Sequence, residues 1–254
     1  MRFDFYDTAP KEVVQACNLC GGHRFLPAGL IDRYELIAPT VRCAACGLRF
    51  LLVRMTEPAY RAFYMEGHYR KLLSAHYGKD ITAHSIEAEQ AVYAERLSTW
   101  LAPYMSEVAS GLLLDLGGST GVVAEHLCKA FDLDGTVVEP SEAEAQRAHS
   151  RGLTTVAARL QDFTTTSHYN LVTLCQTVDH LLDIKADLAR IRKWVAKGGL
   201  LFVDFVEDCP AKIDHPYYLS ADTMHAYLVQ AGFKRLACGR SADGIHMNVL
   251  AGVA

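Results

Sequence analysis

Four of the eight cysteines form two close pairs near the start of the chain, with two residues between Cys17 and Cys20 and two between Cys43 and Cys46. Such pairs supply four thiolates, the number that a closed tetrahedral structural zinc site requires. The 22 residues between the pairs leave room for a β-hairpin or a small loop. The spacing predicts a zinc site that holds a small module together and takes no part in catalysis. Free buried thiols or a redox pair are the alternatives.

A glycine-rich turn is the second candidate site. The apolar run 112–116 leads into Gly117-Gly118-Ser119-Thr120-Gly121 and then into a helical pattern. Glycines allow a sharp turn and let a ligand approach the N-terminus of the helix. Glu139 ends the next strand-like run, where a carboxylate accepts hydrogen bonds from two ribose hydroxyls. This order of strand, turn, helix, strand and acid predicts a nucleoside-bearing cofactor. The alternative is a tight turn without a ligand and a solvated acid.

The residues of the turn favour one cofactor. A nicotinamide-binding loop has the pattern G-x-G-x-x-G, and Ser119 stands where the second glycine of that pattern belongs. The missing glycine disfavours a pyrophosphate pressed against this backbone. Asp115, just before the turn, indicates a ligand with a positive charge there. S-adenosylmethionine carries an ammonium, a carboxylate and a ribose but no phosphate, so we expect this cofactor.

A parallel sheet is needed to position these residues. From Gly111 onward, apolar runs of strand length alternate with helical patterns. The expected strands are 112–116, 136–139, 153–157, 170–175 and 200–206, and the expected helices are 121–131, 141–150 and 184–195, the last stopped by Gly198 and Gly199. Runs that are apolar on both faces and separated by helices indicate a parallel sheet covered on each side.

The end of the chain has a different pattern. A helix is expected to begin after the N-cap Ser220 and to end at Ala231, followed by strands over 233–238 and 245–253. The short turn between these strands has no room for a crossover helix. The last strand must therefore run antiparallel to its neighbour. The predicted fold class is α/β, with a Rossmann-like seven-stranded sheet that has helices on both faces.

Composition and patterning divide the chain into three parts. Residues 1–55 are expected to form the zinc-ribbon-like module, 56–104 a helical linker or cap, and 105–254 the cofactor-binding domain. With 254 residues, a formal net charge of −4 and no apolar stretch long enough to cross a bilayer, a cytoplasmic protein without a membrane partner is expected. The acidic balance also disfavours nucleic acid.

From about Leu112 onward, the chain resembles the class I S-adenosylmethionine-dependent methyltransferases, whose sheet has seven strands and an antiparallel final strand. The run 115–121 is similar to their first motif, Asp162-Phe163 to the pair that flanks the adenine, and 169–180 to their fourth-strand motif. The resemblance implies that the cofactor is bound by Tyr64, Asp115, Gly117, Gly118, Ser119, Gly121, Glu139, Pro140, Asp162, Phe163, Cys175 and Gln176.

The N-terminal part narrows the resemblance. The run 43–50, followed by the aromatic residues Tyr60, Phe63, Tyr64 and Tyr69, is similar to a subgroup with a zinc-binding N-terminal module. That subgroup includes bacterial methyltransferases of nucleotide-linked sugars and surface glycans. The resemblance implies structural zinc on the four paired cysteines and a sugar-like acceptor.

Methyl transfer from a sulfonium needs an acceptor atom aligned behind the methyl group, and a base where the acceptor is a hydroxyl or an acidic C–H. His180 follows the fourth strand, at the edge where α/β sheets bind ligands, and is the expected base. Asp179 and Tyr69 complete the predicted catalytic set. The alternatives are that His180 only caps the following helix and that the tyrosines only pack against the large domain.

The sequence therefore predicts a methyltransferase that uses S-adenosylmethionine, releases S-adenosylhomocysteine, and methylates oxygen or carbon of a small polar acceptor such as a nucleotide-linked sugar. One alternative is an RNA methyltransferase that grips RNA with its zinc module. The basic residues of that module are scattered among acids, which disfavours this function. The other alternative is a noncatalytic protein that binds the cofactor.

Overall fold

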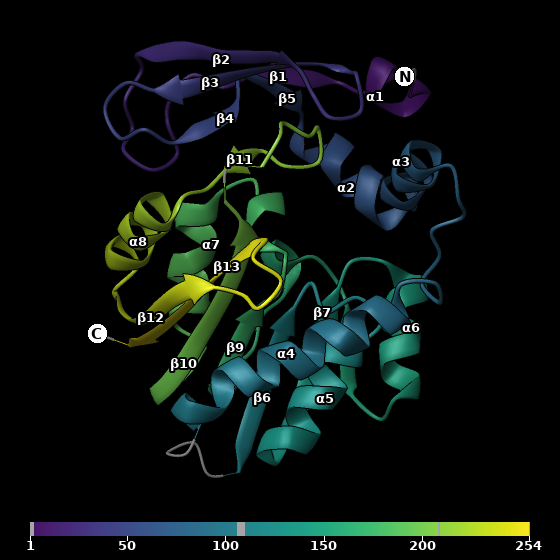
Figure 1. Cartoon of the computed structure of the whole chain (residues 1–254), viewed down its shortest axis with the longest axis vertical. Helices are drawn as coiled ribbons and strands as arrows, with labels where there is room; N and C mark the ends of the chain where they lie inside the picture. Colours follow the sequence, from purple (N-terminus) through teal and green to yellow (C-terminus); the bar gives the residue numbers. More distant parts are fainter. Residues whose placement is uncertain (1–2, 106–109, 208, 254) are drawn as a thin grey trace.

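The computed structural model describes residues 3–105, 110–207 and 209–253. A small N-terminal sheet lies at one end of the molecule, and a larger sheet with its helices forms the other end (Figure 1). No helix in the part that the structure describes is both long enough and apolar enough to span a membrane.

The large sheet has seven strands. They are β6 (Gly111–Leu116), β7 (Leu133–Glu139), β8 (Thr154–Ala157), β9 (Tyr169–Leu174), β10 (Val195–Val206), β12 (Phe233–Arg240) and β13 (His246–Val253). Their spatial order is β12-β13-β10-β9-β6-β7-β8, and β13 runs antiparallel to both of its neighbours. The expected α/β fold with an antiparallel final strand is confirmed.

Helices cover both faces of this sheet. The helices are α5 (Val122–Phe131), α6 (Glu142–Ser150), α7 (Ile184–Ile191) and α8 (Ala221–Gln230), and α4 (Glu87–Met105) precedes the sheet. One core packs apolar residues of α7 and α8 against one face, and a second core packs those of α4, α5 and α6 against the other. The capping box between Ser220 and Thr223 confirms the predicted start of α8.

One predicted boundary is wrong. The apolar spacing predicts a helix over 184–195. In the structure, α7 ends at Ile191 and Val195 begins strand β10. Val195 pairs with Tyr169 of β9, and the register shifts before Leu200. Gly198 adopts a φ of +76°, which only glycine adopts readily, and so allows this irregularity inside the strand. The two glycines therefore interrupt a strand and do not stop a helix.

The N-terminal part contains α1 (Asp4–Thr8), a pair of short strands and a four-stranded sheet. Strand β1 (Lys11–Val13) pairs with β5 (Val53–Met55), and the four-stranded sheet has the order β11-β4-β3-β2. Its strands are β2 (Phe25–Ile31), β3 (Ile37–Cys43), β4 (Arg49–Leu51) and β11 (Tyr217–Tyr218). Strands β2 and β3 form a hairpin between the two cysteine pairs. Because β11 comes from the C-terminal half, this sheet joins distant parts of the chain.

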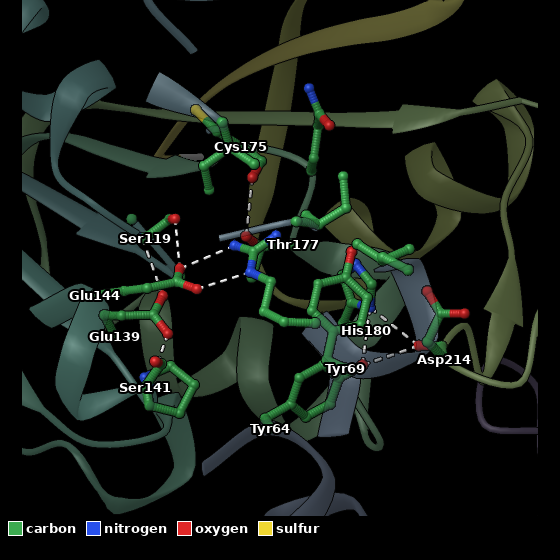
Figure 2. Close-up of a pocket in the computed structure, with 18 of the residues that line it drawn as sticks. Tyr64, Tyr69, Ser119, Glu139, Ser141, Glu144, Cys175, Thr177, His180 and Asp214 are labelled. Carbon is green, nitrogen blue, oxygen red and sulfur yellow. Dashed lines mark hydrogen bonds and ion pairs between the residues drawn. The ribbon is translucent and has the colours of Figure 1, made fainter. Parts of the chain in front are cut away.

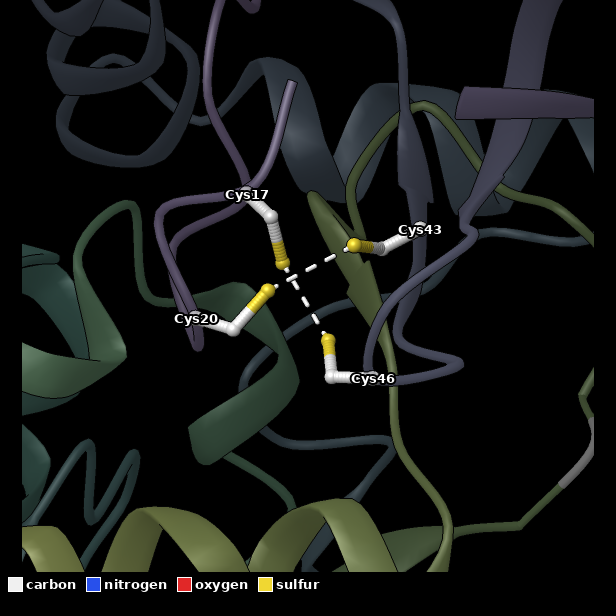
Figure 3. A group of neighbouring side chains, drawn as sticks. All are labelled: Cys17, Cys20, Cys43 and Cys46. Carbon is white, nitrogen blue, oxygen red and sulfur yellow. Dashed lines mark hydrogen bonds between the residues drawn. The ribbon is translucent and has the colours of Figure 1, made fainter. Parts of the chain in front are cut away.

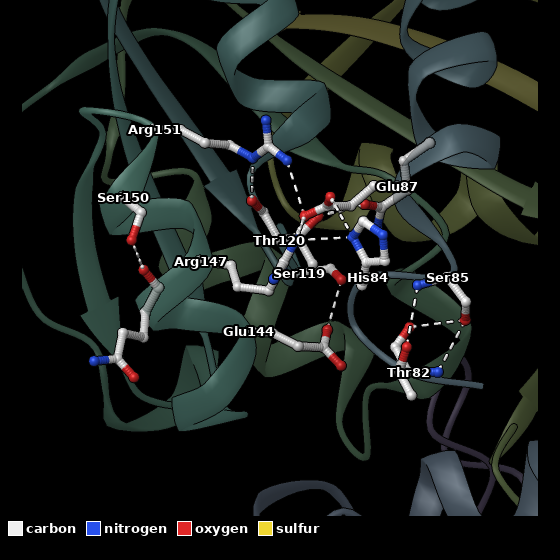
Figure 4. Close-up of polar contacts among 12 residues, drawn as sticks. Thr82, His84, Ser85, Glu87, Ser119, Thr120, Glu144, Arg147, Ser150 and Arg151 are labelled. Carbon is white, nitrogen blue, oxygen red and sulfur yellow. Dashed lines mark hydrogen bonds and ion pairs between the residues drawn. The ribbon is translucent and has the colours of Figure 1, made fainter. Parts of the chain in front are cut away.

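Helices α2 (Glu57–Met65) and α3 (His68–Tyr77) lie between the two sheets (Figure 1). Phe63 and Leu72 bury their side chains in a core shared with Tyr34 and Ile213. A network of arginines holds the start of α4 over the glycine turn (Figure 4). Arg147 and Arg151 lie 2.7 and 2.9 Å from the Glu87 carboxylate, and the Nε of Arg151 donates to the carbonyl of Thr120.

Candidate active site

A cavity of about 690 Å³ opens at the carboxyl ends of β6, β7 and β9 (Figure 2). The turn after β6 supplies Gly117 to this cavity, β7 supplies Glu139, and Cys175 follows β9. Tyr64 of α2 and Tyr69 of α3 line the opposite side. The cavity thus lies where parallel α/β sheets bind ligands, and the cap helices enclose it.

Two glycines of the turn have conformations that other residues adopt with difficulty. Gly117 has a φ of +74°, and a Cβ at this position would lie 2.6 Å from the hydroxyl of Thr177. Gly121 is the N-cap of α5, with a φ of +77°, and a Cβ there would lie 2.8 Å from that of Ala148 on α6. Gly117 therefore lets the Thr177 side chain pack against the turn, whereas Gly121 allows close packing of two helices.

Two carboxylates meet at one end of the cavity. Glu139 accepts hydrogen bonds from the backbone amides of Ser119 at 2.9 Å and Ser141 at 2.8 Å. Glu144 accepts the hydroxyl of Ser119 and forms a bidentate ion pair with Arg70 of α3, at 2.8 and 3.0 Å. Burial, together with the neighbouring charge of Glu144, raises the pKa of Glu139 to about 8. This end of the cavity can accept further hydrogen bonds from hydroxyl groups.

Asp115 is fully buried beneath the turn. Its Oδ1 accepts from the hydroxyl of Thr173 at 2.7 Å, and its Oδ2 has no hydrogen-bond partner among the described residues. Burial raises the pKa of this carboxyl to about 6. An unsatisfied buried carboxylate oxygen is costly unless a ligand completes it. Asp115 beside the turn and Glu139 at the strand end fit the ammonium and the ribose of S-adenosylmethionine.

Two histidines and two aspartates lie on the side of the cavity opposite the glycine turn. Nδ1 of His180 is 2.9 Å from the hydroxyl of Tyr64 and 3.0 Å from the carbonyl of Asp214 (Figure 2). The ring of His215 lies 4.5 Å from that of His180, centroid to centroid. Nδ1 of His215 is 3.1 Å from Asp179, and its Nε2 is 3.5 Å from the carboxylate of Asp214.

These contacts give the two histidines different charge states. Burial and the neighbouring charge of His215 lower the pKa of His180 to about 4. Burial also opposes a charged His215, but Asp179 and Asp214 outweigh it and raise the pKa of His215 to about 10. At neutral pH, His180 is therefore a neutral imidazole beside an imidazolium that is held between two carboxylates.

The structure brings most of the predicted site residues together. Those that line the cavity are Tyr64, Tyr69, Asp115, Gly117, Gly118, Ser119, Glu139, Pro140, Cys175, Gln176 and His180. Asp179 lies behind the cavity wall, and Gly121 packs against α6.

Asp162 and Phe163 do not line the cavity, contrary to the expected contact with the adenine. Asp162 binds Arg159 at 2.9 Å near the surface, and Phe163 packs edge-on against Trp194. The preceding residues, Leu160 and Gln161, do line the cavity. The single turn of 3-10 helix over Leu160–Asp162 directs these earlier side chains inward.

Sequence reasoning missed several residues of the site. Asp204, His215 and Tyr217 stand outside the predicted catalytic set, and all three have buried side chains. Asp204 accepts the backbone amide of Gln176 at 2.6 Å and the hydroxyl of Tyr93 at 3.0 Å, so it fixes one wall of the cavity. Arg70 and Glu144 were also missed, because their pairing joins helices 74 residues apart in sequence.

The four paired cysteines gather at one point of the N-terminal part (Figure 3). The sulfurs of Cys17 and Cys46 are 3.5 Å apart, as are those of Cys20 and Cys43, and all four lie within 4.8 Å of one another. A Cβ on Gly22 would lie 3.3 Å from the sulfur of Cys20, so this position favours glycine. Four thiols converging in this way fit the ligand set of a tetrahedral metal.

The chain matches known proteins over most of its length. A family model described as a methyltransferase domain matches residues 87–237, more than half of the chain. No curated protein matches the chain. Among solved structures, an S-adenosylmethionine-dependent methyltransferase from Clostridium acetobutylicum is 14% identical with a TM-score of 0.55, over 74% of this chain and 97% of that one.

Two further structures have the same fold. The magnesium protoporphyrin IX methyltransferase of Synechocystis, with bound S-adenosylmethionine, is 14% identical with a TM-score of 0.58, over 78% of this chain and 96% of that one. A glycopeptide N-methyltransferase in complex with S-adenosylhomocysteine is 15% identical with a TM-score of 0.53, over 63% and 89%. The family match and the seven-stranded sheet together show that the chain belongs to the class I S-adenosylmethionine-dependent methyltransferases.

Proposed function

We propose that this protein transfers the methyl group of S-adenosylmethionine to oxygen or carbon of a small polar acceptor, with a sugar or nucleotide-linked sugar as the expected class. One observation carries the proposal. One cavity has an unsatisfied carboxylate oxygen of Asp115 and the buried Glu139 on the side of the glycine turn, and the neutral His180 on the side of the cap. A cationic donor requires carboxylates on one side of the cavity. An acceptor that gives up a proton requires a base on the other side.

On the donor side, the cofactor supplies a methyl group on a sulfonium, which needs no further activation. Asp115 would hold the ammonium, and Glu139 would accept hydrogen bonds from the ribose hydroxyls. Gly117 lets the turn pass close to the Thr177 side chain, which lines the same cavity. Tyr64, Ser119, Pro140, Cys175 and Gln176 complete the proposed contacts of the cofactor.

On the acceptor side, the hydrogen bonds fix the tautomer of His180. The carbonyl of Asp214 can only accept, so Nδ1 of His180 must carry a hydrogen. The lone pair is then on Nε2, which takes the proton of an acceptor hydroxyl or acidic C–H. The carboxylate of Asp179 lies 3.1 Å from Nδ1 of His215 and so holds that charged ring beside His180. We therefore assign His180 as the base and Asp179 as a positioning residue.

Tyr69 is the third member of the proposed set. Its ring centroid lies 5.8 Å from that of His180 and 5.6 Å from that of Tyr64. These aromatic rings form an apolar wall that excludes water from the transferring methyl group. The enclosure by α2 and α3 supports an acceptor of limited size, as expected for a sugar-like metabolite.

We further propose that residues 1–55 form a structural zinc module, 56–104 a cap, and 105–254 the catalytic domain of a cytoplasmic enzyme. The converging thiols of the four paired cysteines support the zinc site. A closed set of four thiolates leaves no open position, so the metal would stabilise the module and not bind the acceptor.

Native mass spectrometry and a turnover assay test the proposal. The purified protein should carry one zinc and retain S-adenosylhomocysteine, and it should methylate at least one member of a panel of nucleotide sugars. His180→Ala should lower kcat at least about 100-fold while leaving the affinity for S-adenosylhomocysteine unchanged. Glu139→Ala should instead weaken that affinity. Full activity of both variants would contradict the assigned roles.

A further inference from the structure

Asn18 lies in the turn from Cys17 to Cys20, which we call the knuckle. Its side chain contacts the large domain directly. Its Nδ2 donates to the Oδ1 of Asp183 at 2.8 Å. Its Oδ1 accepts the hydroxyl of Tyr227 at 2.9 Å and the backbone amide of Lys185 at 3.3 Å. The side-chain amide therefore bridges α7 and α8 from a position between two of the proposed metal ligands, Cys17 and Cys20.

Asp183 is the N-cap of α7, and its Oδ1 also accepts the backbone amide of Ala186 at 3.0 Å. One carboxylate oxygen thus accepts hydrogen bonds from both the backbone amide of Ala186 and the side-chain amide of Asn18. As the N-cap, Asp183 fixes where α7 begins. It is also the last residue of the segment 180–183, which starts at His180. Only Leu181 and Leu182 separate Asp183 from His180 in the chain.

The N-terminal part holds the same segment at a second point. The carbonyl of Leu182 accepts the hydroxyl of Tyr217 at 2.8 Å and the Nη1 of Arg54 at 3.3 Å. Arg54 lies on β5, and Tyr217 lies on β11 in the four-stranded sheet. Figure 1 shows that sheet lying over the ends of α7 and α8. His180, Leu181 and Leu182 all line the cavity, so these contacts position one of its walls.

We propose that Asn18 is a positioning residue for His180, through which the cysteine knuckle aligns the acceptor side of the site. This inference rests on the proposed function, because it assigns the knuckle a part in the reaction of that site. The backbone of Asn18 is held between two cysteines, so closing the knuckle around a metal would fix the amide relative to Asp183. The knuckle then acts on the placement of the base and not on the binding of the donor.

Asn18→Asp is the sharpest test, because it keeps the size of the side chain and the acceptor for Tyr227. The variant loses the donor to Asp183 and places two carboxylates side by side. We expect kcat to fall about tenfold. Zinc content and the affinity for S-adenosylhomocysteine should match those of the unchanged protein. Adding Asp183→Asn restores a donor and acceptor pair and should recover most of kcat.

Gln230→Glu is the matched control. Nε2 of Gln230 donates to the carbonyl of Leu19 at 3.1 Å, so the control also breaks a contact of the knuckle, but one with the far end of α8. It should leave kcat within about twofold of the unchanged protein. An equal loss of kcat in this control would overturn the proposal, since general loosening of the module would then account for both results.

Hydrogen exchange followed by mass spectrometry gives a readout that does not depend on turnover. Peptides covering 178–186 should exchange faster in Asn18→Asp and return to normal in the double variant. Unchanged exchange, or faster exchange with unchanged kcat, would overturn the positioning role. Failure of the unchanged protein to methylate any acceptor would contradict the proposed function, and the exchange comparison would still decide whether Asn18 holds this segment.

Discussion

The hydroxyl of Tyr64 lies 2.9 Å from Nδ1 of His180 and donates to the carbonyl of Asp214 at 3.0 Å. Helix α2 of the cap thus contacts the segment after β9 and the loop before β11 at one point. Because that carbonyl also accepts from His180, the three groups together fix the orientation and the tautomer of the imidazole.

Replacing Tyr64 by Phe tests this contact. The variant keeps the aromatic packing against Tyr69 but removes both contacts of the hydroxyl, of which the one with His180 is worth about 1 kcal/mol. We expect kcat to fall about fivefold, with little change in the melting temperature. Steady-state kinetics check this. Tyr60→Phe is the control, because the Tyr60 hydroxyl donates to the carbonyl of Ile213 and does not reach His180. A larger effect at Tyr60 than at Tyr64 would contradict the assignment.

The pH dependence of turnover tests the charge states of the two histidines. A base must be unprotonated, so activity is lost as the pH falls through the pKa of His180, which is about 4. With S-adenosylmethionine saturating, kcat should therefore stay nearly constant from pH 8 down to pH 5.5. His215→Gln removes the neighbouring positive charge and raises the pKa of His180 toward 6.5. The acid limb of the pH profile of kcat/KM should therefore move to higher pH in this variant.

Lys212→Gln is the control for that shift. Lys212 also lowers the pKa of His180, but by less than burial and His215 do. In Lys212→Gln, the acid limb should move to higher pH by less than it does in His215→Gln. An unmoved limb in His215→Gln would show that the imidazolium does not control the base.

Cofactor affinity should depend on the ionisation of Glu139. The pKa of this carboxyl is about 8 without a ligand, so most molecules carry it protonated at pH 7. Ribose hydroxyls that donate to the carboxylate favour its charged form. Binding of S-adenosylhomocysteine should therefore tighten about tenfold between pH 7 and 9 and release a proton. Calorimetry in buffers of different ionisation enthalpy measures both effects. Glu139→Gln should bind weakly at every pH, and an equal pH dependence in that variant would be inconsistent with the assignment.

Loss of one paired cysteine should weaken metal binding. Cys46→Ser removes one of four ligands, and we expect less than one zinc per chain and a lower melting temperature. Cys238→Ser is the matched control, because this exposed cysteine lies outside the cluster. Elemental analysis and thermal unfolding measure the two quantities. Stoichiometric zinc in Cys46→Ser would mean that the metal, if any, lies elsewhere.

The donor side of the site could be predicted from the sequence because its residues follow a local order. Asp115, the glycine turn and Glu139 lie within one strand-turn-helix-strand unit, where spacing determines position. The end of α7 could not be predicted in this way. Val195 continues the apolar spacing of the helix, and only its pairing with Tyr169 shows that it belongs to β10.

The acceptor side depends on contacts between distant residues. The loop with Asp214 and His215 has no regular period, and it is buried because the N-terminal part covers it. For example, the backbone amide of Ile213 donates to the carboxylate of Asp32 at 3.0 Å, across 181 positions of sequence. Periodicity carries no information about such pairs, so the sequence pattern does not show that this loop is buried.

Calorimetric titration of S-adenosylhomocysteine into the full chain tests the central claim most directly. We predict saturable binding of one molecule per chain, weakened at least about tenfold in Glu139→Ala while the melting temperature stays close to that of the unchanged protein. Absence of binding to a folded, zinc-loaded protein would contradict the assignment of the cavity as a cofactor site.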